Sequence, residues 1–486
     1  MTLSTGIPML TWTPMRRSGV SLADQLATHL AERIRNHGLR AGTRLSSVRT
    51  MAQEAGLSRF TVVQAYEKLA AQGLIRSRRG AGFYVLAPTP AMAASAEAAG
   101  LPPDPEAAFD TLFLLRSMFR EVAGMPVPST AGLLPPAWLN HEMVSAAVRN
   151  VGRSGGRSLL GYGVPKGLLA LRQQVASGLQ AQDVPAHPDH HLMTVAGVTH
   201  GLDLISRTFI RPGDTVLVED PGWFMIFGRL TALGARVVGV PRLPDGPDVR
   251  ALAQLAQLHK PVLFIVNSAV HNPTGHTLSA GVAYEVLRIA EQFDFLLVED
   301  DTYADLHPGE PMRLAALDRL NRVLLVGGYS KTLAASLRVG YIAGKRDLID
   351  RLTDTKLLGG LTTPQLGEQV VYRILVEGQY RRHLERLRVR VNDARDECLR
   401  RLLAMGCTIP HEPHAGMFVW ADCGMDTEVL ARRAAARGLL IGPGVLFSPT
   451  QTPSTHFRVA VSLVEDDKGL RVLQSLLGRD DGNRDT

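Results

Sequence analysis

The sequence predicts an α/β protein with a largely parallel sheet and a separate small domain at the N-terminus. Short apolar stretches alternate with helical stretches over the C-terminal three quarters of the chain, which is typical of α/β domains. Residues 1–90 hold twelve basic and four acidic residues, a net charge of +8 in a chain whose total is +7. The Ala- and Pro-rich stretch 87–106 between the two parts predicts a linker.

Composition narrows the class of protein. The 486 residues are 45% hydrophobic and 20% charged, which is normal for a globular chain and excludes a disordered one. No run of about 18 uncharged apolar residues occurs, so no membrane-spanning helix is expected. The three cysteines, Cys398, Cys407 and Cys423, form no disulfide framework and no cysteine-based zinc site. We therefore expect a cytoplasmic protein without a metal.

The N-terminal domain, residues 15–86, has the pattern of a helix-turn-helix followed by a β-hairpin. Ser21 is a candidate N-cap for a first helix, in which leucine or isoleucine recurs at every fourth position. A second helix is expected at 46–55, and Ser58 caps a third after a tight connection. Residues 74–85 predict a hairpin with a basic, glycine-rich tip.

This pattern favours DNA binding. The strong positive charge indicates an acidic partner, although a solvated basic surface is the plain alternative. Polar residues at the start of a recognition helix meet base edges, and a basic hairpin suits phosphate or the minor groove. The alternative is a three-helix module that binds proteins. The candidate DNA-binding residues are Arg59, Thr61 and Gln64 on the third helix and Arg78, Arg79, Gly80 and Gly82 at the hairpin tip.

Residues 20–86 resemble the winged-helix head of GntR-type bacterial regulators, through the stretch LRAGTRLSSVRTMAQEAGLSRFTVVQAYEKLAAQGLIRSRRGAGFYV. The resemblance implies DNA contacts at Arg49, Arg59 and Thr61, with Gly80 and Gly82 at the wing. One departure is visible. The proline that usually precedes the second helix is replaced by Ser46, which relaxes the helix entry but leaves Arg49 in place.

The C-terminal part carries its notable motifs directly after expected strands, where ligands gather in open α/β sheets. The strands are expected at 215–218, 235–240, 262–266, 295–299, 323–327 and 341–343. The glycine-bounded turn 196–201 enters a helix and is a candidate phosphate seat. The other motifs are EDPGW at 219–223, NSAVHNPTG at 267–275, VEDDTY at 298–303 and GGYSK at 327–331, followed by Arg338 and Gly340.

As an ordered set, these motifs resemble the fold-type I aminotransferases that hold pyridoxal 5′-phosphate (PLP), over roughly residues 110–475. The resemblance implies a body at 107–480 with a large, mainly parallel α/β domain and a small α+β domain. Lys331 would be the catalytic amine that binds PLP covalently. Asp300 would keep the pyridine nitrogen protonated. Asn272 and Tyr303 would donate to the ring oxygen, and Trp223 would cover the ring.

The same resemblance assigns the remaining roles. Tyr162 would reach the phosphate of a neighbouring subunit, which implies a homodimer. Arg458 would bind a substrate or effector carboxylate. At two positions where the family commonly has a hydroxyl residue, this sequence has Gly328 and Val198. Each lost hydroxyl is expected to weaken phosphate binding by about 0.5–1.5 kcal/mol. The expected phosphate ligands are Arg338, Thr199, the Val198 amide and Ser330.

The two halves together resemble the MocR-type regulators. The resemblance implies a PLP-dependent transcriptional regulator that binds double-stranded operator DNA as a homodimer and senses an amine, an amino acid or PLP itself. A PLP-dependent aminotransferase with an incidental DNA-binding head is the first alternative, since the catalytic residues are intact. A regulator whose body has lost PLP is the second, and the presence of Lys331 and Asp300 argues against it.

Overall fold

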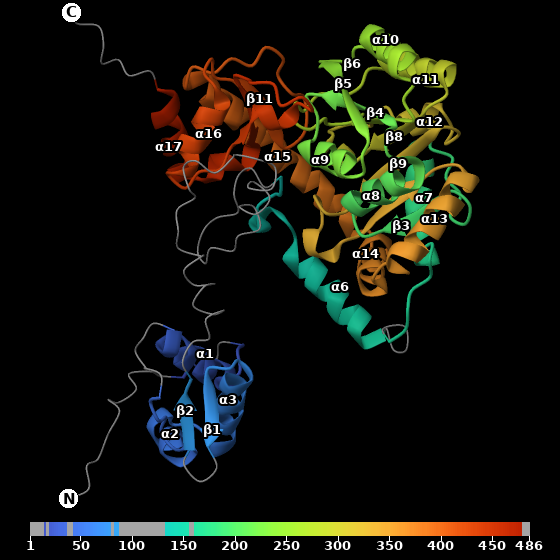
Figure 1. Cartoon of the computed structure of the whole chain (residues 1–486). Coiled ribbons are helices and arrows are strands. Elements are labelled where there is room, and N and C mark those ends of the chain that lie inside the picture. Colours follow the sequence, from blue (N-terminus) through green and yellow to red (C-terminus); the bar gives the residue numbers. More distant parts are fainter. Residues whose placement is uncertain are drawn as a thin grey trace, which may run out of the picture. The chain divides into compact units, whose positions relative to one another are not determined.

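The structure is a computed structural model that describes residues 14–15, 19–35, 42–78, 82–86, 132–154 and 160–478. The chain divides into two compact units, residues 1–104 and 105–486, and each is described by itself (Figure 1). The expected linker at 87–106 and the expected body start at 107 lie outside the described residues. Among the helices of the described ranges, none is long and apolar enough to cross a membrane.

The N-terminal unit is a winged helix-turn-helix, as the sequence predicts. Its two strands pair antiparallel, with Ile75 opposite Val85 and Arg78 opposite Gly82. A serine side chain accepts a backbone hydrogen bond at the start of each of the three helices, and the hairpin follows the third helix directly. The elements are α1 (Leu22–Arg35), α2 (Val48–Ala55), α3 (Arg59–Ala71), β1 (Ile75–Arg78) and β2 (Gly82–Val85).

The second helix starts later than expected. Ser47 is its N-cap and accepts a hydrogen bond from the Thr50 amide at 3.1 Å, so the helix begins at Val48 and the expected start at Ser46 is wrong. Either serine can cap a helix, and sequence alone does not choose between neighbours. Gly56 ends the helix at φ 62°, in the left-handed region that glycine adopts without strain.

One core holds the head together. Tyr66 on α3 is fully buried, donates to the Ser46 carbonyl at 2.8 Å and packs edge-to-face on Phe83 of the hairpin. The apolar face of α1 packs against the same side of α3. The buried residues of this core include Leu26, Leu30, Met51, Val62, Ala65, Leu69, Leu74, Ile75 and Val85.

The body contains an eight-stranded sheet in the order β3-β10-β9-β8-β7-β4-β5-β6. β9, β8, β7, β4 and β5 are parallel, whereas β10 is antiparallel to both of its neighbours. The six expected strands are present, and the sheet contains two further strands, β3 and β6, that were not predicted. The strands are β3 (Leu192–Val195), β4 (Thr215–Asp220), β5 (Arg236–Leu243), β6 (Gly246–Pro247), β7 (Leu263–Val266), β8 (Leu296–Asp300), β9 (Val323–Gly328) and β10 (Gly340–Ala343).

Helices cover both faces of this sheet (Figure 1). Along β9, Val323 and Leu325 belong to one core and Leu324 and Val326 to the other, as the pleat requires. The first core is shared with α7 (Leu169–Gln180), α10 (Val249–His259), α11 (Ala280–Phe293) and α14 (Gln365–Val376). The second is shared with α8 (Val198–Phe209), α9 (Phe224–Ala232) and α13 (Arg346–Gly360). α6 (His141–Ser154) packs on α14.

A small α+β subdomain follows, drawn in orange and red in Figure 1, and it confirms the predicted second part of the body. Its antiparallel sheet has the order β11-β13-β12. Its own buried core is separate from the two sheet cores. The elements are α15 (Gln379–Ala404), β11 (Phe418–Asp422), α16 (Thr427–Ala435), β12 (Gly442–Pro443), β13 (His456–Ala460) and α17 (Asp467–Leu477).

Candidate cofactor and DNA-binding sites

Strand direction brings the motifs of the body to one edge of the sheet. β4, β7, β8 and β9 are parallel, so the residues that follow them meet at the carboxyl edge. β3 runs the same way because two antiparallel pairings separate it from β9. β10 runs back from this edge, which places Arg338, two residues before it, beside the end of β3.

Asp300, the last residue of β8, is buried at this edge. Its Oδ1 accepts a hydrogen bond from the Thr302 amide at 3.0 Å, and its carbonyl oxygen accepts one from Asn267 Nδ2 at 2.5 Å. Burial raises the pKa of Asp300, whereas the Thr302 hydrogen bonds and the charge of Lys331 oppose the shift. A buried carboxylate of this kind favours a cationic partner such as a protonated pyridine nitrogen.

Lys331 follows β9 and is partly buried in the same site. Its Nζ donates to the Gly132 carbonyl at 2.7 Å and lies 6.0 Å from the centre of the Tyr303 ring. Burial lowers its pKa to about 8, with further lowering by the charges of Arg458 and Arg338, while Asp300 opposes the shift. The lysine therefore holds more of its neutral, nucleophilic form near neutral pH than an ordinary surface lysine does.

Arg458 comes from β13 of the small subdomain and reaches into this site. Its Nη1 donates to Asn272 Oδ1 at 2.8 Å, and Asn272 also hydrogen bonds with Tyr303. The guanidinium lies over the rings of Phe418 and Phe447, at 4.3 and 5.0 Å. Burial lowers the pKa of Arg458 to about 10, so it remains a cation at neutral pH. The structure thus brings three predicted site residues into direct contact.

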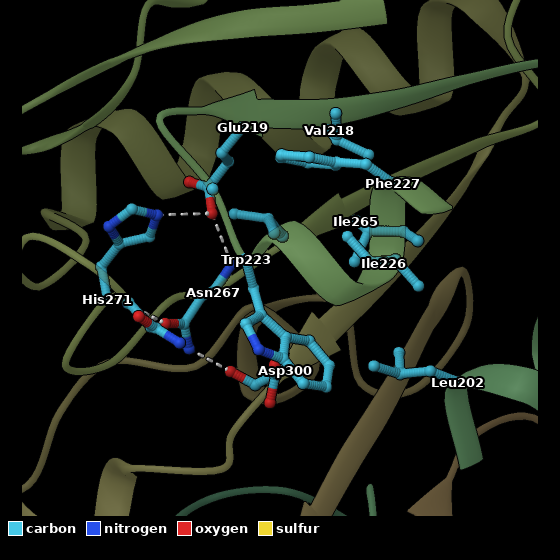
Figure 2. Close-up of a pocket in the computed structure, with 13 residues that line it drawn as sticks. Leu202, Val218, Glu219, Trp223, Ile226, Phe227, Ile265, Asn267, His271 and Asp300 are labelled. Carbon is cyan, nitrogen blue, oxygen red and sulfur yellow. Dashed lines mark hydrogen bonds and ion pairs between the residues drawn. The ribbon is translucent and has the colours of Figure 1, made fainter. Parts of the chain in front are cut away.

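A pocket lies between the strand ends and α9. Trp223, Asn272 and Asp300 are among its lining residues. Figure 2 shows the polar side chains Glu219, Asn267 and His271 on one side and apolar side chains, including Ile226 and Ile265, on the other. Polar groups thus line one side of this pocket and apolar groups the other.

Arg338 and the start of α8 form the candidate phosphate seat. Arg338 donates to Ser330 Oγ at 3.3 Å and to the Ala196 carbonyl at 2.9 Å. Gly197 has φ +79°, and a Cβ atom there would lie 2.5 Å from Arg338 Nη2, so a side chain would strain the backbone and displace the guanidinium. α8 begins at Val198, and no side chain caps it. Its first turn, with Val198 and Thr199, therefore offers amide groups and a positive dipole end to an anion.

The two unusual residues of this seat belong to one packing arrangement. A Cβ atom at Gly328 would lie 3.3 Å from Val198 Cγ2 and 3.2 Å from the Val339 carbonyl oxygen. The valine methyl thus closely approaches the position in which a side chain at residue 328 would start. A larger side chain at residue 328 would therefore crowd Val198, while Arg338 still donates to Ser330 at this seat.

Tyr162 stands apart from this group. It is 84% exposed, as a residue that acts on a neighbouring subunit would be in a single chain. Its segment packs on the start of α14, because a Cβ atom at Gly163 would lie 3.3 Å from the Thr363 carbonyl oxygen. The exposed large apolar residues of this segment, of the nearby α13 and α14 and of the turn between them include Leu160, Val164, Leu358, Leu361 and Leu366.

A buried ionic cluster on the polar side of the pocket was not predicted from the sequence. The Glu219 carboxylate pairs with Arg242 and accepts from the Asn267 amide at 2.8 Å, while His271 Nε2 lies 3.4 Å away. Burial raises the pKa of Glu219, but Arg242 and His271 together lower it to about 2. Asn267 Oδ1 accepts from the Asn272 amide at 2.8 Å and so links this cluster to the site. The sequence did hold one signal for this cluster: Glu219 and Asn267 stand at the ends of two strands, β4 and β7, that pair in the sheet.

Taken together, the residues of the body fit PLP. Lys331, with its lowered pKa, supplies an amine, and the buried Asp300 supplies a partner for the ring nitrogen. Gly197 leaves room for Arg338, which supplies an anion seat. The individual roles of these residues stay predictions.

The head presents three of its predicted DNA-binding residues to solvent. Arg49 on α2 and Arg59 and Gln64 on α3 are exposed. Thr61 is partly buried, and its hydroxyl lies 2.8 Å from that of Ser58. These residues lie on the two helices that a helix-turn-helix uses for DNA.

The wing is described only in part. Gly82 starts β2 at φ +100°, and a Cβ atom there would lie 3.3 Å from Arg44 Nε. Arg44 is exposed beside the wing and was not predicted. The predicted wing residues Arg79 and Gly80, and the side chain of Arg78, lie outside the described residues.

Comparisons with known proteins match both units. Residues 133–476 match the family model of aminotransferase class I and II, and residues 22–85 match that of the gntR family of bacterial regulatory proteins. The chain is 27% identical to the uncharacterized HTH-type transcriptional regulator YdfD of Bacillus subtilis, over 92% of this chain and 94% of that protein. It is 28% identical to the probable rhizopine catabolism regulatory protein MocR of Rhizobium meliloti, over 91% and 89%.

A solved structure supports the same assignment for the body. LysN, the α-aminoadipate aminotransferase of Thermus thermophilus complexed with N-(5′-phosphopyridoxyl)-L-leucine, superposes with a TM-score of 0.67 at 27% identity, covering 72% of this chain and 92% of that one.

Fold and site thus define a PLP-binding protein of the aminotransferase fold with a DNA-binding winged helix. The chain belongs to the aminotransferase class I and II family and, through its gntR-family head, to the MocR-type transcriptional regulators.

Proposed function

We propose that the protein regulates transcription in the cytoplasm by binding an operator through its head and an amine or amino-acid effector, or PLP, through its body. One observation carries the proposal: a complete set of candidate PLP residues and an exposed DNA-binding face occur in a single chain. A protein that only catalysed transamination would have no use for the second.

Each residue of the body site has a defined task in this proposal. When bound, PLP supplies an aldehyde for which the Lys331 amine and an effector amine compete. Asp300 balances the charge of the ring nitrogen, and Trp223 covers the ring face. Arg338, Ser330, Thr199 and the Val198 amide bind the phosphate. Asn272 and Tyr303 hydrogen bond to the ring oxygen.

The effector carries a carboxylate in this proposal. Arg458 is a buried cation at neutral pH, and one of its donors is engaged by the neutral side chain of Asn272. A carboxylate would be a stronger acceptor for a guanidinium than an amide oxygen is. Because Arg458 comes from the small subdomain, its engagement would draw that subdomain toward the large one, and this movement would be the signal that reaches the head.

A homodimer completes the proposal. Tyr162 and the exposed apolar residues near it, among them Leu358 and Leu361, form a surface that a second subunit would cover. Tyr162 would then contact the phosphate of that subunit, so cofactor binding and dimerisation would be linked.

Two measurements on the purified full-length chain test the function. After incubation with PLP and dialysis, the protein should absorb in the visible, and it should retain duplexes from a random-sequence DNA pool. Failure to hold PLP overturns the sensor, and failure to select any DNA sequence overturns the regulator.

Aminotransferase activity is the second candidate function, favoured by the presence at one site of Lys331, Asp300 and Arg458, since the charges of both other residues act on the pKa of Lys331. Steady turnover of amino acids with 2-oxo acids at about 1 per second or faster would support it. A regulator is expected to turn over far more slowly while its operator affinity responds to the amino acid.

A further inference from the structure

The exposed face of α3 carries an apolar residue at its centre. Successive residues of an α-helix turn by about 100°, so the buried residues of α3 point one way and Phe60 points the opposite way. Phe60 is 71% exposed, and Val63, one turn further on, is 37% exposed. Gln64 continues the same face. The buried residues that define the other face are Val62, Ala65, Tyr66 and Leu69.

The position of Phe60 indicates that the molecule bound by α3 has an apolar group for the ring to contact. Phe60 follows Arg59, the first residue of the helix, and Ser58 caps the helix by accepting from the Thr61 amide at 3.0 Å. Side chains of this first turn extend beyond the helix start, which is where recognition helices meet base edges. A phosphate contact would leave the phenyl ring unused. In the major groove of DNA, the 5-methyl group of thymine is the apolar feature that a side chain meets.

We propose that Phe60 is a specificity-determining residue that binds the 5-methyl group of a thymine in the operator, with Val63 packed beside it. The inference rests on the proposed operator binding. The excess of eight positive charges in residues 1–90 brings the helix to a polyanion, and Arg59 lies next to Phe60. Gln64, one turn along, is placed to read an adenine on the same face. Each operator half-site should therefore contain a thymine whose methyl group contributes to affinity.

Replacing thymine by deoxyuridine tests this contact, because deoxyuridine keeps every hydrogen-bonding group and lacks only the methyl. The full-length protein first selects its sequence from a random duplex pool. Each thymine of the selected sequence is then replaced in turn, and affinity is measured at constant salt. At one position in each half-site, the wild type should lose about fourfold, the value for removing one buried methyl.

Phe60→Ala removes the ring from both heads of the dimer, so it should bind the thymine duplex about as weakly as the wild type binds a duplex with deoxyuridine at that position in both half-sites. The variant should no longer distinguish thymine from deoxyuridine there. Phe60→Leu, which keeps an apolar side chain, should retain part of the discrimination. Val20→Ala is the matched control: Val20 is an exposed apolar residue of the same unit that lies outside α3. Its variant should keep the full deoxyuridine penalty.

Several results would overturn the inference. The wild type could bind thymine and deoxyuridine duplexes equally at every position, or Phe60→Ala could keep the wild-type penalty. If Phe60→Ala left DNA binding intact but abolished a response to effector, the ring would contact protein and not DNA. A failure to select any DNA would instead refute operator binding itself. Thermal unfolding of each variant should match the wild type, since Phe60 is exposed.

Discussion

At the scale of single residues, burial acts on opposite charges at one site and leaves both groups less charged than they would be in water. Burial lowers the pKa of Lys331 to about 8 and raises that of Asp300. The lysine becomes a better nucleophile, and the aspartate would be stabilised as a carboxylate by a protonated ring nitrogen. An exposed lysine and aspartate would keep their ordinary pKa values and would not have this reactivity.

Lys331→Ala should abolish covalent attachment of PLP, because the amine is removed. After borohydride reduction, mass spectrometry should find the cofactor mass on the wild type and none on the variant. Lys345→Ala removes an exposed lysine of the same unit and is the control. Cofactor mass on the Lys331→Ala protein would show that another amine forms the bond.

The rate at which the PLP-free protein captures PLP should rise with pH and level off above about pH 9. Lys331 is protonated below its pKa of about 8 and neutral above it, and only the neutral amine is nucleophilic. Stopped-flow absorbance across pH 6–10, in about unit steps, measures the midpoint. A rate that keeps rising past pH 10 would mean that the amine has the pKa of an ordinary lysine.

At the scale of elements, the phosphate seat depends on the close approach of the β3–α8 turn and Arg338. Gly197→Ala should weaken PLP binding by about tenfold or more, because the methyl would meet the guanidinium and the residue has a left-handed φ. Gly228→Ala, in α9, is the control because nothing lies within 4 Å of its Cβ position. Equal PLP dissociation constants for the two variants would contradict the seat.

Features that depend on residues close together in the sequence could be predicted. Contacts between residues that are far apart in the sequence and meet only when strands pair could not. Ser58 caps α3 and Asp300 ends β8, as local sequence patterns indicate. The contact of Val198 with the space beside Gly328 joins residues 130 positions apart and requires the pairing of β9 and β10. The Glu219–Arg242 pair and the antiparallel direction of β10 were missed for the same reason.

At the scale of the whole molecule, the proposed dimer links two heads. The fragment 1–86, whose helices and hairpin share a core of their own, should bind the selected duplex more weakly than the full chain by a factor of about 100 or more, because linked heads gain effective concentration. Fluorescence anisotropy at several salt concentrations measures both affinities. Each should fall steeply with salt, as phosphate contacts require. Equal affinities for fragment and full chain would contradict a dimer that places two heads on one operator.

The central claim is that chemistry in the body changes DNA binding by the head. The most direct test is operator affinity of the PLP-loaded full chain, measured with and without each of a panel of amino acids, and for Lys331→Ala in parallel. One amino acid or a PLP vitamer should change wild-type affinity about 5- to 150-fold, the usual range of allosteric coupling, and amino acids should leave Lys331→Ala unchanged. Unchanged wild-type affinity across the panel, together with steady transamination at enzyme-like rates, would contradict the regulator and identify the protein as an aminotransferase.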